Sequence, residues 1–442
     1  IDDAADFSAM GHQARGRYCL FMAPTHALGN PIVRIALVLV GIALVATPLA
    51  PSAAAGITRP FKATKTITLA PGIVYQKGTM RTTGGRIQSV RVGTIDGMNP
   101  AASVRSMLSN DRVIRMERPS RIARRNSSPA ARAMIATNGD RSVFGRVDAY
   151  AAPHSVHVSN GELMVARACI RPTLGIDSSG RGRIDAVRVR TVMLIPGFDK
   201  PRIIHRVNTH RDDSLVVLYT KRFASSTQTA TGGIEVILAL SEKISPSGSQ
   251  EVRVTRIRRG GGNTALRAGE AVLSVKGTRG KWVKQLRVGQ RMTLKTSFVR
   301  KVDSPCGGKV QVASGWSDVV EAMGGNYFTA RGGRVKAPSA STYRPGSRRH
   351  PRTNVGVTAD GRILMVTVDG RQSGYSVGVT LREMGRLMVS LGAKAAFNLD
   401  GGGSTVMAKR NLVSGEFKVT NRPSDGRERV QSQALVAFSL AP

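Results

Sequence analysis

Three consecutive glycines follow an aspartate at the end of an apolar run, and this arrangement constrains the fold more than any other part of the sequence. Ala395 to Leu399 predicts a buried strand, and Asp400-Gly401-Gly402-Gly403-Ser404 follows it directly. Because glycine has no Cβ atom, such a backbone can turn sharply and can bring its N–H groups close to an oxyanion. Gly-Lys-Ser/Thr is missing, so this is not a Walker A loop. The segment is therefore either an anion-binding loop or a tight turn with a capping aspartate.

The segment before this loop predicts a hairpin followed by a helix. Asp360 and Gly361 divide two β-branched runs within residues 354–368, which is typical of a hairpin turn. Thr380 and Glu383 fit the capping box, in which each side chain accepts from an unpaired backbone N–H at the start of a helix. We therefore expect the order strand, turn, strand, helix, strand and glycine-rich loop.

Most of the remaining chain predicts short strands bounded by turn residues. The β-branched runs are 73–75, 87–92, 155–158, 186–192, 215–219, 234–238 and 252–257. Residues 101–108 and 317–323 predict short helices, and 118–132 predicts an exposed basic loop. No period of 20–50 residues repeats. We expect an α+β fold: one β-rich catalytic domain with a few short helices, preceded by a signal peptide.

The N-terminal region has the pattern of a secretory signal peptide. Arg34 precedes the apolar run 35–46, and small residues follow in Ser52 to Gly56. Twelve residues form a helix of about 18 Å, too short for a bilayer core of about 30 Å. Met22 would give a signal of ordinary length; a buried helix or an uncleaved anchor is the alternative. We divide the chain into 1–55 (upstream residues and signal), 56–130 (β-rich basic region) and 131–440 (catalytic domain).

A formal charge of +38, from 66 Lys and Arg against 28 Asp and Glu, predicts attraction to polyanions unless it reflects a basic proteome. Nearly all of the excess lies in residues 56–353, with 52 basic and 18 acidic residues; residues 354–442 hold 11 and 7. For an exported protein, a phosphorylated glycan or anionic wall polymer is a more accessible partner than nucleic acid. We therefore expect a secreted or envelope-associated protein, with no transmembrane segment after signal cleavage.

The cysteines and histidines give no metal motif. No C-x-x-C pair is present, and export would permit a disulfide between Cys169 and Cys306, with two separate thiols as the alternative. His205 and His210 lie near two aspartates, where a metal site and an exposed loop are both possible. The sequence requires no cofactor and leaves a divalent metal undecided.

Two further aspartates follow apolar strands and are candidate acids or bases. Asp369 closes the second strand of the hairpin, where a plain turn is the alternative. Asn138 and Asp140 follow the apolar run 133–136, where a type I′ turn is the alternative. Arg352 could bind a phosphate with both arms of its guanidinium group.

Taken together, these segments make the C-terminal third resemble the phosphodiester glycosidase family, whose relatives include the "uncovering" enzymes that remove N-acetylglucosamine from a phosphodiester-linked mannose. The segments that carry the resemblance are Arg352-Thr353, 355–362, 368–371, 378–383, Asn398 to Ser404 and 421–429, with Asn138-Gly139-Asp140 as a weaker N-terminal part. One departure is Arg141-Ser142, where the family usually has an aromatic pair.

The resemblance implies hydrolysis of a sugar-1-phosphodiester at the anomeric carbon. It implies a catalytic carboxylate, for which we rank Asp400 first, Asp369 second and Asp140 third. Phosphate and substrate contacts would come from Arg352, Asn138, Asn398, Gly401, Gly402, Gly403 and Ser404. The alternative is a non-catalytic envelope protein that binds anionic polysaccharide; no nuclease motif supports a nucleic-acid enzyme.

Overall fold

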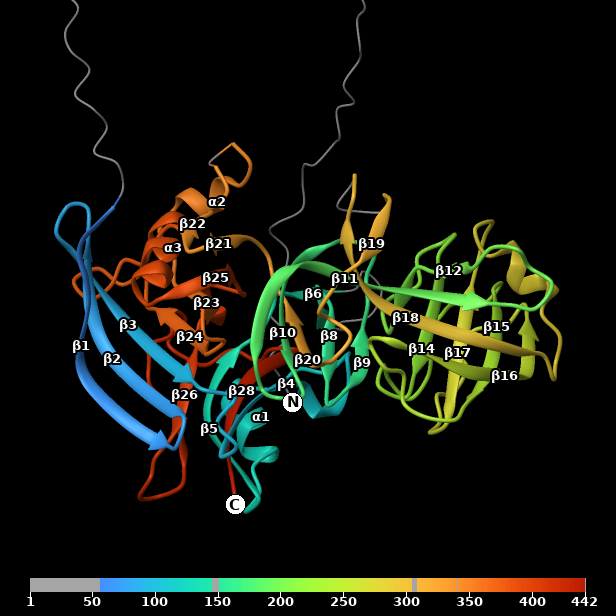
Figure 1. The fold of residues 1–442 in the computed structure, drawn as a ribbon, viewed down its shortest axis with the longest axis horizontal. Helices are drawn as coiled ribbons and strands as arrows, with labels where there is room; N and C mark the ends of the chain where they lie inside the picture. Colours follow the sequence, from blue (N-terminus) through green and yellow to red (C-terminus); the bar gives the residue numbers. More distant parts are fainter. Residues whose placement is uncertain (1–55, 145–150, 304–307, 340, 442) are drawn as a thin grey trace, which may run out of the picture. The chain divides into compact units, whose positions relative to one another are not determined.

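The computed structural model describes residues 56–144, 151–303, 308–339 and 341–441. They belong to one compact unit, Ala53–Pro442. The expected signal peptide, within residues 1–55, lies outside the described residues. Cys169 is disulfide-bonded, whereas Cys306, the partner expected from the sequence, also lies outside them. As the sequence predicts, the chain is β-rich with short helices (Figure 1).

The first sheet is antiparallel and interleaves the C-terminal strands with the first strands of the described chain. Its order is β1 (Ile57–Ala70), β2 (Ile73–Thr82), β3 (Arg86–Ile95), β24 (Ile363–Val368), β23 (Arg352–Thr358), β25 (Ala393–Asn398), β21 (Phe328–Arg331) and β22 (Arg334–Val335). The predicted hairpin is β23 and β24, with Val355 opposite Met365. β25 lies on the other side of β23, so the strand before the glycine-rich loop is inside the sheet.

Helix α3 (Leu381–Ser390) packs on one face of this sheet. Thr380 accepts a hydrogen bond from the Glu383 backbone N–H at 3.1 Å, and Glu383 accepts one from the Thr380 N–H at 2.9 Å. The predicted capping box is therefore confirmed. Leu387 and Met388 are fully buried against β24 and β25 residues, which fixes the helix over the sheet.

The second sheet packs on the other face of the first. Its order is β27 (Phe417–Val419), β26 (Met407–Arg410), β5 (Ala131–Asn138), β28 (Gln433–Leu440) and β4 (Ala102–Leu108). Ile135 and Leu435 of this sheet share a buried cluster with Met365 and Phe397 of the first. Helix α1 (Pro119–Arg125) covers its outer face through Ile122. The layers are thus helix, sheet, sheet and helix, and β5 and β25 belong to the two facing sheets.

A third sheet is built mainly from the chain between β5 and β21. Its order is β13 (Arg206–Val207), β14 (Val216–Thr220), β17 (Glu270–Val275), β15 (Ile234–Leu240), β16 (Gly248–Arg259), β18 (Arg291–Lys301), β11 (Gly182–Leu194), β10 (Arg171–Asp177), β20 (Val319–Gly324), β8 (His157–Ser159) and β9 (Glu162–Val165), with β12 (Arg202–Ile204) beside β11 and β19 (Val310–Val312) beside β18. β6 (Ser142–Phe144) and β7 (Ala151–Pro153) form a separate ribbon, and α2 (Arg344–Ser347) is one short turn. The largest buried cluster belongs to this sheet, which gives the region its own core.

Three local predictions from the sequence are wrong. The helices expected at 101–108 and 317–323 are strands β4 and β20, and the loop expected at 118–132 contains helix α1. β4 alternates buried and half-buried residues, and it pairs with β28 from Gln433 to Ser439. Ala, Met and Leu favour helices locally, but pairing in a sheet outweighs that preference. Within the described residues, no helix is long and apolar enough to span a membrane.

Candidate active site

The ends of β5 and β25 bring the two predicted acidic motifs into direct contact. The Asp400 N–H donates to the Gly139 carbonyl at 3.1 Å. The Asn138 side-chain amide donates to the Asp400 carbonyl at 2.9 Å, although the two residues are 262 positions apart. The Asn138 oxygen accepts from the Thr353 hydroxyl at 2.8 Å and from the Val406 N–H at 3.2 Å. Asn138 therefore holds the two loops together, and its side chain is fully used in doing so.

Asp140 is a buried carboxyl group beside Asp400. Only 1% of its surface is exposed. Burial raises the pKa of Asp140 to about 7 and the Asp400 charge adds to the rise; contacts from Ser155 and the Arg141 N–H oppose it. One oxygen accepts from the Arg141 N–H at 2.7 Å, and the other has no hydrogen-bond partner of good geometry among the described residues. Burial therefore favours the protonated form of this carboxyl group well above the pH at which an exposed aspartate loses its proton.

Asp400 has a more polar environment. It is half-buried, and burial raises its pKa; hydrogen bonds from Ser404 and the Gly401 N–H oppose the rise, as do the charges of Arg141 and Arg429. The Gly401 N–H donates to the carboxylate at 3.0 Å. Two neighbouring carboxyl groups in unequal environments are typical of an acid and base pair.

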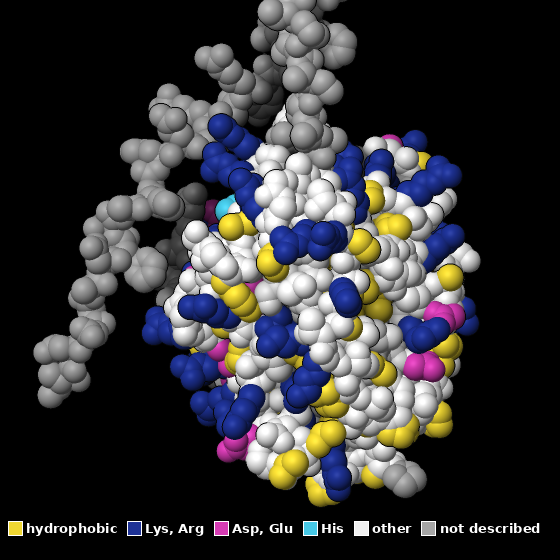
Figure 2. Space-filling model, turned by 90° about the vertical axis from the view of Figure 1, so that its left-hand side faces the viewer, with side chains coloured by type: hydrophobic (Ala, Val, Ile, Leu, Met, Phe, Trp, Pro, Cys, Tyr) yellow, Lys and Arg dark blue, Asp and Glu magenta, His cyan; other side chains and the backbone are white. Residues whose placement is uncertain are grey.

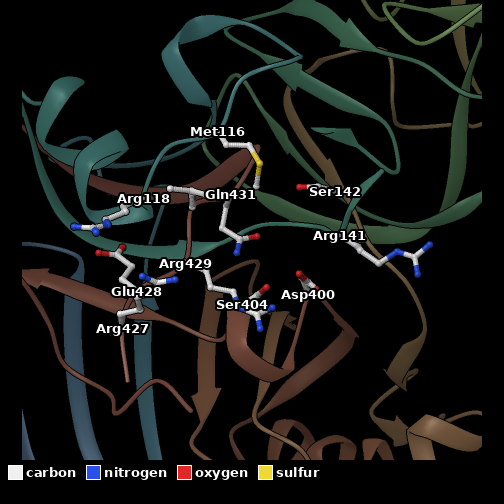
Figure 3. A pocket seen from close by; sticks show the side chains of 11 residues that line it. Met116, Arg118, Arg141, Ser142, Asp400, Ser404, Arg427, Glu428, Arg429 and Gln431 are labelled. Carbon is white, nitrogen blue, oxygen red and sulfur yellow. The ribbon is translucent and has the colours of Figure 1, made fainter. Parts of the chain in front are cut away.

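Asp400 opens into a pocket of about 400 Å³. Its lining residues are Met116, Arg118, Arg141, Ser142, Asp400, Ser404, Arg427, Glu428, Arg429, Val430 and Gln431. Figure 3 shows Gln431, Ser404, Asp400 and Arg429 converging on the centre, with Arg118 and Arg141 on opposite sides. The lining holds four arginines and two acidic residues, so the pocket favours an anionic ligand. Asp400 places one carboxylate beside such a ligand.

Three of the four arginines are available to a ligand. Arg429 pairs with Asp425, whereas Arg118, Arg141 and Arg427 have no ion pair within the described residues. The acid Glu428 accepts from the Ser120 backbone and hydroxyl at 2.8 and 2.6 Å. The unpaired positive charge around Asp400 therefore exceeds the unpaired negative charge.

Asp369, our second catalytic candidate, is not among the residues that line this pocket. It is 1% exposed. It accepts from the Tyr375 hydroxyl and the Asn421 amide at 2.9 Å each, and from the Arg422 N–H at 3.1 Å. Asn421 in turn donates to the Thr405 carbonyl at 3.1 Å, just after the glycine-rich loop. Asp369 thus supports the end of the loop through Asn421.

Arg352, predicted to bind phosphate, is also outside the pocket lining. It is 4% exposed, and it donates to the carbonyls of Val379, Pro345 and Arg348 at 3.2, 2.9 and 3.1 Å. Burial lowers the pKa of Arg352 to about 10. In this structure its guanidinium group therefore fastens the α2 segment to β23.

The three glycines serve mainly to shape the loop. The Gly401 N–H binds Asp400, and the Gly402 N–H donates to the Pro351 carbonyl at 2.9 Å, so neither points to a ligand. Gly402 has a φ of 64°, and a Cβ atom on Gly403 would lie 2.3 Å from an Asp425 oxygen. A side chain at Gly402 would be strained by this backbone conformation, and one at Gly403 would have to displace the Asp425 carboxylate. Ser404 lines the pocket, whereas Asn398 is buried and donates to the Leu399 carbonyl.

Sequence reasoning missed most of the pocket's cationic wall. Arg118 belongs to the segment predicted as an exposed basic loop, and Gln431 to a segment without a chemical motif. Arg427 lies within the 421–429 segment, and Arg141 is the departure from the family pattern. The 421–429 segment was part of the resemblance, which was the only available signal. No group of three or more His, Cys, Asp or Glu side chains in the described ranges is placed to hold a metal.

Comparison with known proteins agrees with the resemblance seen in the sequence. Residues 248–438 match the family model described as phosphodiester glycosidase. The match includes Asp400, Asp369, Arg352 and the 427–431 side of the pocket, but it begins after Asp140 and so does not include it. The C-terminal region is therefore similar to phosphodiester glycosidases, which supports a glycosidase-type enzyme.

Individual relatives are more distant. The SPbeta prophage-derived uncharacterized protein YomE of Bacillus subtilis (strain 168) is 42% identical over 87 residues, which is 20% of this chain and 12% of that protein. This chain thus aligns with only about an eighth of that curated relative.

Solved structures share the fold. A hypothetical protein from Synechocystis is 19% identical with a TM-score of 0.64, over 86% of this chain and 64% of that one. A protein from Burkholderia pseudomallei is 20% identical with a TM-score of 0.59, over 83% and 77%. The zebrafish N-acetylglucosamine-1-phosphodiester alpha-N-acetylglucosaminidase catalytic domain, auto-inhibited by its pro-peptide, is 13% identical over 85% and 86%, and its TM-score of 0.42 is too low to support an inference.

Proposed function

We propose that this protein hydrolyses the glycosidic bond of a sugar-1-phosphodiester. The observation that carries the proposal is the pair Asp140 and Asp400, in unequal environments, beside a pocket lined by four arginines. The family match over residues 248–438 supports the same reaction class. The reaction breaks the bond between the anomeric carbon and the phosphate oxygen, and water supplies the new hydroxyl.

The arginines suit the leaving group. When the glycosidic bond breaks, its electron pair stays on the phosphate oxygen, and negative charge grows there. Arg118, Arg141 and Arg427 line the pocket, and the guanidinium groups of Arg118 and Arg141 point outward in Figure 3, so they would turn inward to donate to those oxygens. Charge-assisted hydrogen bonds are among the stronger ones in proteins. Because a phosphodiester is already a fair leaving group, the site depends less on a strong general acid than ordinary glycosidases do.

The two carboxyl groups take different roles in this proposal. Asp400 faces the pocket and acts as the carboxylate, either attacking the anomeric carbon or taking a proton from the attacking water. Asp140 is buried and does not line the pocket, so in this proposal its proton reaches the leaving phosphate through Asp400 or through one water molecule; with a pKa near 7, it keeps that proton for much of the time. A second full negative charge there would repel an anionic substrate, so a raised pKa is useful at this position.

For the substrate, we propose an N-acetylglucosamine-like sugar on a phosphate-containing glycan or wall polymer, outside the cytoplasm. The apolar run 35–46 motivates the location, and the charge of +38 motivates the anionic polymer. The location and the anionic polymer are both inferred from the sequence. The arginine-lined pocket supports only an anionic substrate.

The direct test is release of free sugar from a synthetic N-acetylglucosamine-1-phosphodiester with a neutral methyl aglycone. The wild type should release sugar and methyl phosphate, which phosphorus NMR detects, and Asp400→Asn should be nearly inactive. No release by wild type on this or related sugar-1-phosphodiesters would refute the reaction class. Undiminished release by Asp400→Asn would refute the site.

A second candidate is a non-catalytic protein that binds anionic polysaccharide, and the net charge favours it. Figure 2 shows Lys and Arg side chains spread over the face in view, with few acids among them. Such a protein should bind anionic polymer without consuming it, and weaken steeply with salt. Sugar release that disappears in Asp400→Asn would exclude this candidate as the full account.

A further inference from the structure

A second hollow adjoins the pocket described above. Its volume is about 480 Å³, and its lining residues are Asn110, Met116, Glu117, Arg118, Arg121, Arg124 and Val430. Met116, Arg118 and Val430 line both hollows. The two hollows therefore share a wall, and one extended ligand could occupy both.

The second hollow is also cationic. Arg118 and Arg124 are exposed and have no ion pair among the described residues, and Arg121 pairs with Glu117 at 3.4 Å. Glu117 is buried and already accepts from Arg125 at 3.2 Å and from the Asn110 N–H at 3.1 Å. Its charge is thus shared between two arginines, which leaves an excess of positive charge facing solvent.

We propose that this hollow is a second anion subsite. It binds a second phosphate group of the same substrate molecule whose sugar-1-phosphodiester occupies the first pocket. The inference rests on the proposed function and narrows its substrate class from a single phosphodiester to a chain with at least two phosphates. Arg118, at the shared wall, lies between the two phosphates. Arg121 and Arg124 contact only the second one.

Guanidinium groups fit phosphate well. Each presents several N–H donors in one plane, which match two phosphate oxygens at once. Because Arg121 and Arg124 are exposed, their attraction is screened by salt and should weaken within ordinary ionic strengths. The expected gain is therefore moderate, and it should appear in KM rather than in kcat.

The test compares two substrates and two matched pairs of variants. One substrate is a sugar-1-phosphodiester with a neutral aglycone; the other has an aglycone of equal length that ends in a second phosphodiester. Arg124→Gln and Arg124→Glu are compared with Arg86→Gln and Arg86→Glu, which change an exposed arginine at the start of β3. Each pair changes the net charge equally, so a general charge effect is separated from a local one.

We expect Arg124→Gln to raise KM for the two-phosphate substrate about fivefold and Arg124→Glu more than tenfold, with the one-phosphate substrate unchanged. The Arg86 variants should leave both substrates within twofold. If both substrates respond equally to Arg124→Glu, or if neither responds, the second subsite is wrong while the reaction stands. Thermal melting of each variant checks that it is folded.

Calorimetric binding separates this inference from the proposed function. If wild type cleaves neither substrate, the reaction fails, yet binding of the two-phosphate compound can still be measured at low and high salt. Tighter binding of the two-phosphate compound than of the one-phosphate compound, lost in Arg124→Glu but kept in Arg86→Glu, supports the subsite. Equal binding of the two compounds overturns it.

Discussion

Asp400 and Asp369 look alike in the sequence, since each ends a strand of the same sheet and each precedes glycine. In the structure Asp400 is half-buried, lines a pocket and lies beside Asp140. Asp369 is 1% exposed and accepts from Tyr375, Asn421 and Arg422. Asp400 can still accept hydrogen bonds from a ligand, whereas the carboxylate of Asp369 already accepts hydrogen bonds from the protein on both oxygens.

The same contrast separates the arginines. Arg352 gives its guanidinium group to three backbone carbonyls, whereas Arg141 has no ion pair in the described chain and lines the pocket. Residue type and position after a strand therefore do not identify a catalytic group. What distinguishes the two regions is how much hydrogen-bonding capacity remains after folding.

The largest effect is expected for Asp400→Asn. This change should lower kcat about 10³-fold, because the amide can neither attack carbon nor accept a proton from water. The melting temperature should change little, since the residue is half-buried. Sugar release measured beside a melting curve tests both points; a loss of activity that only follows unfolding would contradict the assignment.

Asp140→Asn is expected to lower kcat about 10²-fold and to remove one limb of the pH profile. In wild type, kcat should fall as the pH rises through about 7, because Asp140 loses its proton there. It should also fall at acidic pH, where Asp400 becomes protonated. The two apparent pKa values belong to the coupled pair. An alkaline limb that persists in Asp140→Asn would assign that limb to another group.

The same variant should be more stable than wild type at alkaline pH. Because burial raises the pKa of Asp140 to about 7, the folded state keeps a proton between about pH 4 and 7 that the unfolded state has lost. The carboxyl group therefore destabilises wild type increasingly as the pH rises across this window, by roughly 3–4 kcal/mol above it. Urea unfolding at pH 8 and at pH 4 should show a large difference between variant and wild type at pH 8 and little at pH 4.

Asp369→Asn should act on stability and spare the chemistry. An amide would face three donors with a single acceptor oxygen, which we expect to cost about 2 kcal/mol of unfolding free energy. The kcat of the folded fraction should stay within about tenfold of wild type. A much larger fall in kcat with an unchanged melting curve would return Asp369 to the catalytic group.

The smallest effects distinguish the two arginines. Arg352→Gln should lower stability by about 1–2 kcal/mol, since it frees carbonyls that the guanidinium now binds, and it should leave KM within about twofold. Arg141→Gln should show the opposite pattern, with a KM about fivefold higher and normal stability. A raised KM in Arg352→Gln alone would support the phosphate contact predicted from the sequence.

Local sequence signals located the C-terminal elements well. The hairpin across 354–368, the helix capped by Thr380 and the strand before Asp400 all form, because each has a turn or cap signal within a few residues. Residues 101–108 were misassigned because their strand depends on pairing with Gln433 to Ser439, which no local pattern shows. Asp140 was predicted as a candidate, but its contact with the Asp400 loop depends on how two sheets face each other.

The pocket's arginines show the same limit. Arg118, Arg141 and Arg427 lie in chain segments far apart, and in such a basic sequence no single arginine is conspicuous. These arginines are recognised as pocket residues only in the folded structure, where they line the same pocket.

The pairing of β28 between β5 and β4 has a consequence for biosynthesis. Residues 433–440 lie between two strands that leave the ribosome about 300 residues earlier, so both remain without their common partner until β28 has been made. The Asp140 end of the site is anchored on β5, and the other wall, 427–431, immediately precedes β28. A growing chain therefore has no assembled pocket before β28 is made, and the site becomes competent only once that strand is inserted.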